Sequence, residues 1–321
     1  MEINSEDGRF RIISNPTDDE VKAFQKGFEM YNMERTNGEY NSPEDWLSLV
    51  LRDHEGNIVG GIMTSTIFWV QYLEVFWVDE RYRRLGYGRD LIHEAEILAK
   101  KNGCLASQTY TFSWQGPDFY QAVGYKLIAT YDGYVDGITE LILSKRLDML
   151  NDVPSQKAES TRFTISDDSS EESQTIVRRG LGKNFDDHVI NLLKEYPHTG
   201  IQLIIKNDEG QVIGGLCGYS VLGTMTLDDL WVDERYRSQG YGKDLLMYAE
   251  TIAKERGCIA LQTACFSFQN LGFMKSQGFD TFGVSDVYPR GVKEYYLIKR
   301  IEKEKNSSNQ VYLRASVIRN S

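Results

Sequence analysis

Hydrophobic and polar positions alternate between helix-like and strand-like patterns along the first half of the chain. Val21, Phe24 and Phe28 recur at helical spacing, which predicts a helix over residues 18–33. Apolar residues recur in the same way over 87–103, which predicts a second helix. Shorter β-rich runs lie around these segments. They predict strands at 10–13, 46–52, 58–67, 72–78, 104–110 and 138–147, and a short helix is expected at about 117–123. The order expected overall, βααβββαβαββ, indicates a mixed sheet with helices on its faces.

The second half of the chain repeats the first at an offset of 154 residues. WVDERYRRLGYGRDL (77–91) aligns with WVDERYRSQGYGKDL (231–245) without a gap, and GCLASQT (103–109) aligns with GCIALQT (257–263). A period this long indicates a duplicated domain rather than a solenoid. The predicted boundaries are 1–147 for the first domain, 148–161 for a polar linker, 162–301 for the second domain and 302–321 for an unassigned tail. The two domains are called the first repeat and the second repeat below.

Composition indicates a chain that buries a core. It is 41% hydrophobic and 12% aromatic over 321 residues, which excludes a disordered or low-complexity protein. No apolar run reaches the roughly 18–20 residues that span a bilayer. The N-terminus is polar and acidic, without the apolar stretch of a signal peptide. We therefore expect a cytoplasmic protein with no membrane partner.

Charge narrows the possible ligands. The formal net charge of −11 argues against nucleic acid as a partner, because phosphate backbones attract clustered lysine and arginine. Residues 1–152 carry almost all of this excess, which suits a cationic ligand such as an amine. The four cysteines form no CxxC pair and the four histidines are isolated, so we expect neither a disulfide framework nor a metal site.

A strand, a glycine motif and a helix follow one another in both repeats. The motif is R-x-x-G-x-G, at 83–88 in the first repeat and at 237–242 in the second. Glycine lets backbone N–H groups approach a ligand closely, and the helix adds the positive end of its dipole. This arrangement predicts a cradle for a pyrophosphate. A Rossmann dinucleotide site would have a third glycine where Leu91 and Leu245 stand.

These segments resemble a known family. The sequence VDERYRxxGYGxDL, present in both repeats, resembles motif A of the GNAT superfamily of acyl-CoA-dependent N-acyltransferases. TFSWQGPDFYQAVGY (111–125) resembles motif B of that superfamily. The second repeat has CFSFQNLGFMKSQGF (265–279) there, so Met274 stands in the place of Tyr120. The resemblance covers most of both repeats.

The resemblance implies an α/β fold with mixed α+β sheets, built as two tandem GNAT-like domains that form a pseudo-dimer within a monomeric chain. It also implies that acetyl-CoA, as co-substrate, enters between two diverging parallel strands in each repeat. The residues implied for cofactor binding are Val78, Arg83, Arg84, Leu85, Gly86, Tyr87, Gly88 and Arg89 in the first repeat, and Val232, Arg237, Ser238, Gln239, Gly240, Tyr241, Gly242 and Lys243 in the second.

The implied activity is transfer of an acetyl group to a primary amine of a small molecule or a protein, as in an acyltransferase of class EC 2.3.1.-. By its match to motif B, Tyr120 is the candidate acid that protonates the leaving thiolate, and packing of a short helix is its alternative role. Strand alternation places Glu74 on one face with Phe76 and Val78. That carboxylate could accept the amine's proton, directly or through water, or attract the cation; a solvated or ion-paired carboxylate is the alternative.

The two repeats differ at the candidate acid. A thioether cannot donate a proton, so Met274 predicts that the first domain catalyses and that the second has lost or weakened catalysis. Two alternatives stay open for the second domain: another hydroxyl, such as that of Tyr288 or Ser276, could protonate the thiolate, or water could do so. The competing hypothesis is a non-catalytic protein that binds or senses acyl-CoA on a GNAT scaffold. Such a protein would need the acid in neither repeat, whereas an enzyme needs it in one.

Overall fold

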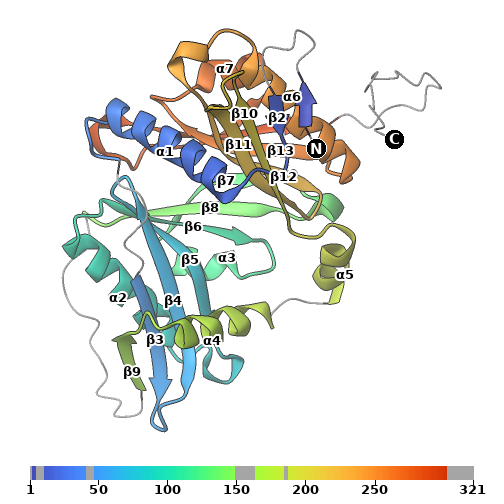
Figure 1. Ribbon diagram of the computed structural model, residues 1–321. Coiled ribbons are helices and arrows are strands. Elements are labelled where there is room, and N and C mark those ends of the chain that lie inside the picture. The colour runs from blue at the N-terminus through green and yellow to red at the C-terminus, as the bar shows by residue number, and fades with distance from the viewer. Residues whose placement is uncertain (1, 5–10, 41–46, 149–162, 184–186, 302–321) are drawn as a thin grey trace.

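The computed structural model describes residues 2–4, 11–40, 47–148, 163–183 and 187–301, which form two mixed β-sheets (Figure 1). The seven-stranded sheet has the order β7 (Lys126–Tyr131), β8 (Glu140–Arg146), β6 (Ala106–Phe112), β5 (Val70–Val78), β4 (Ile58–Ile67), β3 (Leu47–Asp53) and β9 (Phe163–Asp167). The eight-stranded sheet has the order β1 (Glu2–Asn4), β2 (Arg11–Ile13), β10 (Thr199–Lys206), β11 (Val212–Val221), β12 (Thr224–Val232), β13 (Ala260–Phe266), β15 (Glu294–Arg300) and β14 (Asp280–Ser285). Neighbouring strands are antiparallel except for the pairs β5–β6 and β12–β13, which are parallel.

Helices cover the faces of both sheets, as the hydrophobic pattern predicts. They are α1 (Asp18–Arg35), α2 (Tyr87–Lys101), α3 (Pro117–Ala122), α4 (Glu171–Gly182), α5 (Asp187–Glu195), α6 (Tyr241–Glu255) and α7 (Leu271–Ser276). The second repeat has the predicted order βααβββαβαββ. In the described part of the first repeat a single helix, α1, lies between β2 and β3, so the second helix expected there is not found.

Each sheet contains a segment from the other repeat. β2 of the first repeat pairs with β10 of the second, and α1 packs on β10, β11 and β12. In return, β9 of the second repeat pairs with β3 of the first, and α4 packs on β3, β4 and β5. In Figure 1 the blue α1 therefore lies on the upper unit with the orange α6, and the yellow-green α4 lies on the lower unit with α2. The units of packing thus exchange a strand and a helix, and they do not coincide with the sequence repeats.

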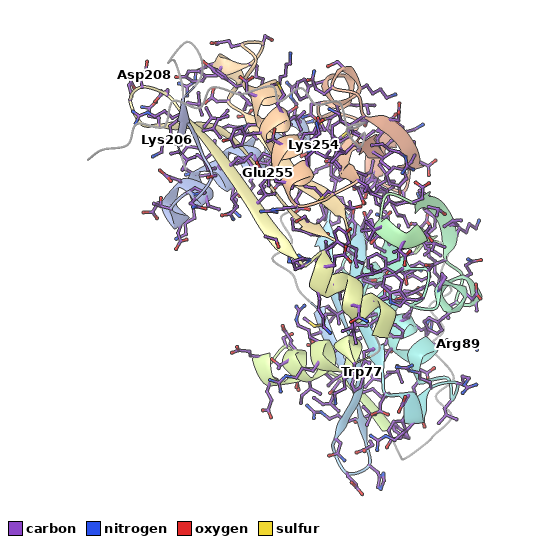
Figure 2. The ribbon with its side chains drawn as sticks, turned by 90° about the vertical axis from the view of Figure 1, so that its right-hand side faces the viewer. Trp77, Arg89, Lys206, Asp208, Lys254 and Glu255 are labelled. Carbon is purple, nitrogen blue, oxygen red and sulfur yellow. The ribbon has the colours of Figure 1, made fainter. Side chains whose placement is uncertain are left out.

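Glycines allow the exchanged helices to approach the sheets closely. A Cβ added at Gly27 in α1 would overlap the indole ring of Trp231 in β12, and a Cβ added at Gly180 in α4 would overlap the ring of Trp77 in β5. Figure 2 shows Trp77 beside α4. Since the two contacts lie at equivalent positions of the repeats, the same close packing holds both exchanged helices in place.

We predict that Gly180→Ala destabilises the protein by about 1–3 kcal/mol, the usual cost of overpacking a buried contact. Gly182→Ala in the same helix is the matched control, because a Cβ there meets no atom within 4 Å. Alanine favours a helix over glycine, so the control should be neutral or slightly stabilising. Urea unfolding measures both, and equal effects of the two substitutions would show that the contact with Trp77 is not tight.

A buried carboxylate joins the two sheets. Oε2 of Glu294 in β15 accepts hydrogen bonds from the hydroxyls of Tyr288 (2.6 Å) and Tyr296 (2.5 Å). Gln108 of β6, in the first repeat, donates to the same oxygen at 3.3 Å and to Tyr296 Oη at 2.8 Å. Burial raises the pKa of Glu294, although these hydrogen bonds act in the opposite direction. The folded protein therefore holds this proton to a higher pH than the unfolded chain does.

The raised pKa of Glu294 predicts a contribution to stability that falls as pH rises. Above the ordinary glutamate pKa of 4.5 the unfolded chain releases this proton while the folded protein keeps it, so the free energy of unfolding decreases with pH until the folded pKa is passed. Glu294→Gln removes this contribution. We expect a flatter dependence of unfolding free energy on pH, measured by urea unfolding between pH 5 and 8; an unchanged slope would contradict the assignment.

Candidate active site

The sheet opens at equivalent places in the two repeats. The parallel pairing of β5 with β6 ends at Leu73 and Thr109, and that of β12 with β13 ends at Leu227 and Thr263. Beyond these points the pairs no longer share hydrogen bonds, although each strand continues for several residues. The diverging parallel strands that the family resemblance implies are therefore present in both repeats.

A β-bulge at each opening turns one carboxylate out of the regular strand pattern. The register between β4 and β5 shifts so that Val75 and Leu73 have partners while Glu74 has none. The register between β11 and β12 shifts in the same way around Asp228. Bulges re-aim side chains and often accompany functional sites. The equivalent acids Glu74 and Asp228 thus occupy the same special position in the two sheets.

Each R-x-x-G-x-G motif forms the turn that leads into a long helix. Gly86, with φ 97°, precedes α2, and Gly240, with φ 95°, precedes α6. This left-handed conformation suits glycine because it has no Cβ. Nε of Arg83 donates to the carbonyl of Val78 at 2.8 Å, and the equivalent bond from Arg237 to Val232 has the same length. The arginines thereby tie the turn to the end of the preceding strand, and the first N–H groups of a 15-residue helix lie at each turn.

A cavity lies at each opening. The first pocket, of about 620 Å³, is in the first repeat, and the second pocket, of about 350 Å³, is in the second. The predicted residues that line the first pocket are Glu74, Val78, Arg83, Arg84, Gly86, Gly88, Arg89 and Tyr120. Those that line the second are Val232, Arg237, Ser238, Gly240, Tyr241, Gly242 and Lys243, together with Asp228 and Met274.

Three predicted cofactor residues have side chains outside the pockets. Leu85 is exposed to solvent, and Tyr87 packs on Phe163 of β9 with ring centroids 4.2 Å apart. The side chain of Gln239 donates to the carbonyl of Arg235 at 3.2 Å. Only the main chain at Leu85, Tyr87 and Gln239 is therefore available to a ligand in the cradle.

Tyr120 lies on α3 at the inner wall of the first pocket. Its side chain is buried and has the rings of Phe76 and Tyr125 within 6.2 Å and 5.9 Å of its own. Burial raises the pKa of Tyr120 to about 12, while a hydrogen bond with Thr109 acts in the opposite direction. The hydroxyl is therefore protonated at neutral pH and can donate a hydrogen bond into the pocket.

The two bulge carboxylates have different surroundings. Glu74 is exposed to the first pocket and accepts a hydrogen bond of 2.6 Å from Ser65 Oγ. Asp228 opens into the second pocket, where desolvation by the surrounding protein, with the neighbouring Asp229 carboxylate, raises its pKa to about 7. The two equivalent acids, both exposed, thus have different neighbours, a serine hydroxyl beside Glu74 and a second carboxyl group beside Asp228, which the sequence repeat alone did not indicate.

Residues of the exchanged helices also line the pockets. Phe28 and Tyr31 of α1 contribute to the second pocket, and Leu181 of α4 contributes to the first. The sequence analysis assigned Phe28 only to the apolar face of a helix and did not single out the other two. Their helical spacing gave no indication of which sheet they would face.

The described residues contain no cluster of three or more side chains that could hold a metal ion. None of the helices among these described residues is long and apolar enough to cross a membrane.

The comparisons with known proteins agree with this geometry. A family model described as Acetyltransferase (GNAT) family matches residues 15–125 and again residues 169–279, which together exceed half of the chain. The chain belongs to the GNAT family of acetyltransferases. It is therefore an acyltransferase enzyme with two GNAT domains in one chain, and the predicted family, fold class and tandem arrangement are confirmed.

Three relatives each match less than half of the chain. Blasticidin-S acetyltransferase of Streptomyces morookaense is 39% identical over 93 residues, covering 29% of this chain and 68% of that protein. An acetyltransferase of Agrobacterium fabrum is 29% identical over 140 residues, covering 43% of this chain and 98% of that protein. The crystal structure of an acetyltransferase from Bacillus cereus has 31% identity and a TM-score of 0.38, covering 42% of this chain and 95% of that one.

Proposed function

We propose that this GNAT enzyme transfers an acetyl group from acetyl-CoA to a primary amine of a small molecule or a protein. The observation that supports it best is the first pocket, in which a glycine cradle at a helix N-terminus, a protonated tyrosine and a carboxylate line one cavity. The relative that is named for acetylating blasticidin S supports a small-molecule acceptor. We propose that the enzyme acts in the cytoplasm.

In this proposal the cradles hold the pyrophosphate of acetyl-CoA. Backbone N–H groups over 84–89 and 238–243 would bind its oxygens, helped by the positive ends of α2 and α6. Arg84, Arg89 and Lys243 add positive charge from the pocket walls. Main-chain groups at Val78 and Val232 would pair with the pantetheine arm, which places the thioester at the opening of the strands.

The first pocket supplies both proton transfers that the reaction needs. The acceptor enters as an ammonium ion, and Glu74 takes its proton directly or through one water molecule. The free amine attacks the thioester carbon, the C–S bond breaks as the tetrahedral intermediate collapses, and Tyr120 protonates the departing thiolate. The second proton that the nitrogen loses as the amide forms returns Tyr120 to its neutral form. Since the second pocket has Met274 in place of the tyrosine, we propose that it is the slower site of a monomer built as an internal pseudo-dimer.

The alternative is an acyl-CoA-binding protein without turnover. Release of free CoA, followed with a thiol reagent over a panel of amines, distinguishes the two functions. Turnover with at least one amine supports the enzyme, and CoA binding without turnover over the whole panel would support the alternative.

We predict that Tyr120→Phe lowers kcat by about 10²–10⁴, the usual contribution of a positioned general acid, with little change in KM for acetyl-CoA. Tyr125→Phe is the control, because that hydroxyl is bonded to Ser107 at 2.8 Å and does not line the pocket. If Tyr120→Phe retains nearly full activity while Gly240→Glu abolishes it, the second repeat is the main catalyst and the assignment is wrong.

We also predict that Gly86→Glu and Gly240→Glu each reduce the CoA stoichiometry measured by calorimetry from two to one. A glutamate in the cradle adds bulk, strain at positive φ and a charge that repels the pyrophosphate. Gly56→Glu is the matched control, because Gly56 also has positive φ (86°) and open space around it but lies in the β3–β4 turn. Two bound CoA molecules in either cradle variant would contradict the proposed binding sites.

A further inference from the structure

The second pocket is built jointly by the two repeats. Its cradle and floor belong to the second repeat, but Phe28 and Tyr31 reach it from α1 of the first. With Trp231 and Phe273 they give the pocket aromatic side chains from two directions. The equivalent helix α4 gives the first pocket only Leu181 among its described residues. The two pockets therefore share a cradle design, and where α1 gives the second pocket Phe28, α4 gives the first pocket Leu181.

Phe28 and Tyr31 form the α1 side of the second pocket, called the aromatic wall below. Contacts between the two repeats hold this part of α1 in position. Tyr31 Oη donates to the carbonyl of Phe268 at 3.3 Å, and Gln269 Nε2 donates to Asn32 Oδ1 at 2.8 Å. The guanidinium of Arg237 lies over the ring of Tyr31, 4.7 Å from its centroid. An ion pair between Glu39 and Arg290 fixes the chain just beyond α1. The aromatic wall is therefore an ordered part of the second pocket.

Asp228 brings to this pocket a carboxyl group that has no cationic partner among the described residues. Asp228 lines the pocket from the bulge in β12, with Asp229 next to it, and no lysine or arginine of the described residues contributes to the shift of its pKa or forms an ion pair with it. Three titratable groups interact electrostatically with Asp228: Asp229 on its own strand, and Cys217 and Tyr219 on β11. Cys265 on β13 and Tyr31 on α1 also line the pocket, and Arg237 and Lys243 line its cradle. A carboxylate among apolar walls is stabilised by a cationic partner, which a ligand can supply.

We propose that the second pocket is a second acceptor site, specific for an amine with an aromatic or apolar body, and that Asp228 takes the proton from this amine. The aromatic wall from α1 receives the body of the acceptor, and the carboxylate receives its ammonium group. This proposal rests on the proposed acetyl transfer and assigns a substrate class to the second site.

The reaction at this site balances without a protein acid. Ionised Asp228 removes one proton from the ammonium group, and the amine attacks the thioester carbon. As the C–S bond breaks, the nitrogen loses a second proton to solvent and solvent protonates the CoA thiolate, so the products are the acetyl amide, CoA and protonated Asp228. Met274 takes no part in proton transfer. Ionisation of Asp228 sets the pH dependence: because its pKa is about 7, activity at this site rises as pH increases through 7 and levels off above it.

The experiment uses the full chain with the first cradle closed by Gly86→Glu, so that only the second site binds acetyl-CoA. CoA release is measured between pH 5.5 and 8.5 with phenylethylamine as the aromatic probe and ethylamine as the small one. In this background we expect turnover that prefers phenylethylamine and rises with an apparent pKa near 7. Asp228→Asn should lower it by about 10²–10⁴ and remove the rise, whereas Asp208→Asn, in the exposed turn between β10 and β11, should leave it unchanged.

A second variant tests the wall. Phe28→Ala, in the same background, should raise KM for phenylethylamine several-fold and leave KM for acetyl-CoA unchanged. Calorimetry should show one bound CoA in every variant, which confirms that each is folded. Should Asp228→Asn not fold, the amine preference and the Phe28→Ala result decide the proposal alone.

The outcomes separate this proposal from the proposed function. If the wild type turns over no amine, the acetyl-transfer function fails. If the wild type is active and the Gly86→Glu variant binds one CoA without turnover, only the second site is wrong. Turnover that Asp228→Asn leaves unchanged also overturns the proposal. So does turnover that shows no preference for phenylethylamine and is unaffected by Phe28→Ala.

Discussion

The close approach of each exchanged helix to the sheet of the other repeat is the contact on which the rest of this enzyme depends. Gly27 in α1 and Gly180 in α4 leave room for the indole rings of Trp231 and Trp77, and a side chain at either position would push helix and sheet apart. Interiors are packed to near-crystalline density, so such a displacement would spread to neighbouring strands. Trp77 and Trp231 also line the two pockets, which means that the contact that joins the repeats shapes both sites at the same time.

This arrangement explains how two similar sequences form two different sites. The cradles repeat nearly residue for residue, because the left-handed glycine and the arginine-to-strand hydrogen bond are needed in both. The pockets differ where each is lined by a helix of the opposite repeat, Phe28 and Tyr31 of α1 in one and Leu181 of α4 in the other. Glu74 with a serine hydrogen bond and Asp228 with a second carboxylate beside it occupy equivalent bulges. Each repeat therefore contributes one strand and one helix to the sheet of the other, and the helix also lines the other repeat's pocket.

The sequence was sufficient to predict most of the local elements and the two glycine turns, because helical periodicity, strand runs and glycine turns are set by neighbouring residues. It did not predict the exchange. Strands β2 and β9 come from equivalent places in the repeats, so each could pair with β3 or β10 on pattern alone, and the choice depends on long-range packing. Nor could it predict that Leu85, Tyr87 and Gln239 point away from the pockets or that the pKa of Asp228 lies near 7, since both follow from three-dimensional surroundings.

Zero-length carbodiimide cross-linking tests the exchange most directly. Glu20 of α1 forms an ion pair with Lys206 at the end of β10, which belongs to the other repeat (Figure 2 shows Lys206). Glu250 and Lys254, 3.0 Å apart within α6, provide an internal control for the chemistry. Mass spectrometry of the monomeric cross-linked protein should find both the Glu20–Lys206 and the Glu250–Lys254 isopeptide bonds. If the control bond forms in the monomer and the Glu20–Lys206 bond is absent, or occurs only between chains, α1 does not pack on the second repeat and the jointly built site is wrong.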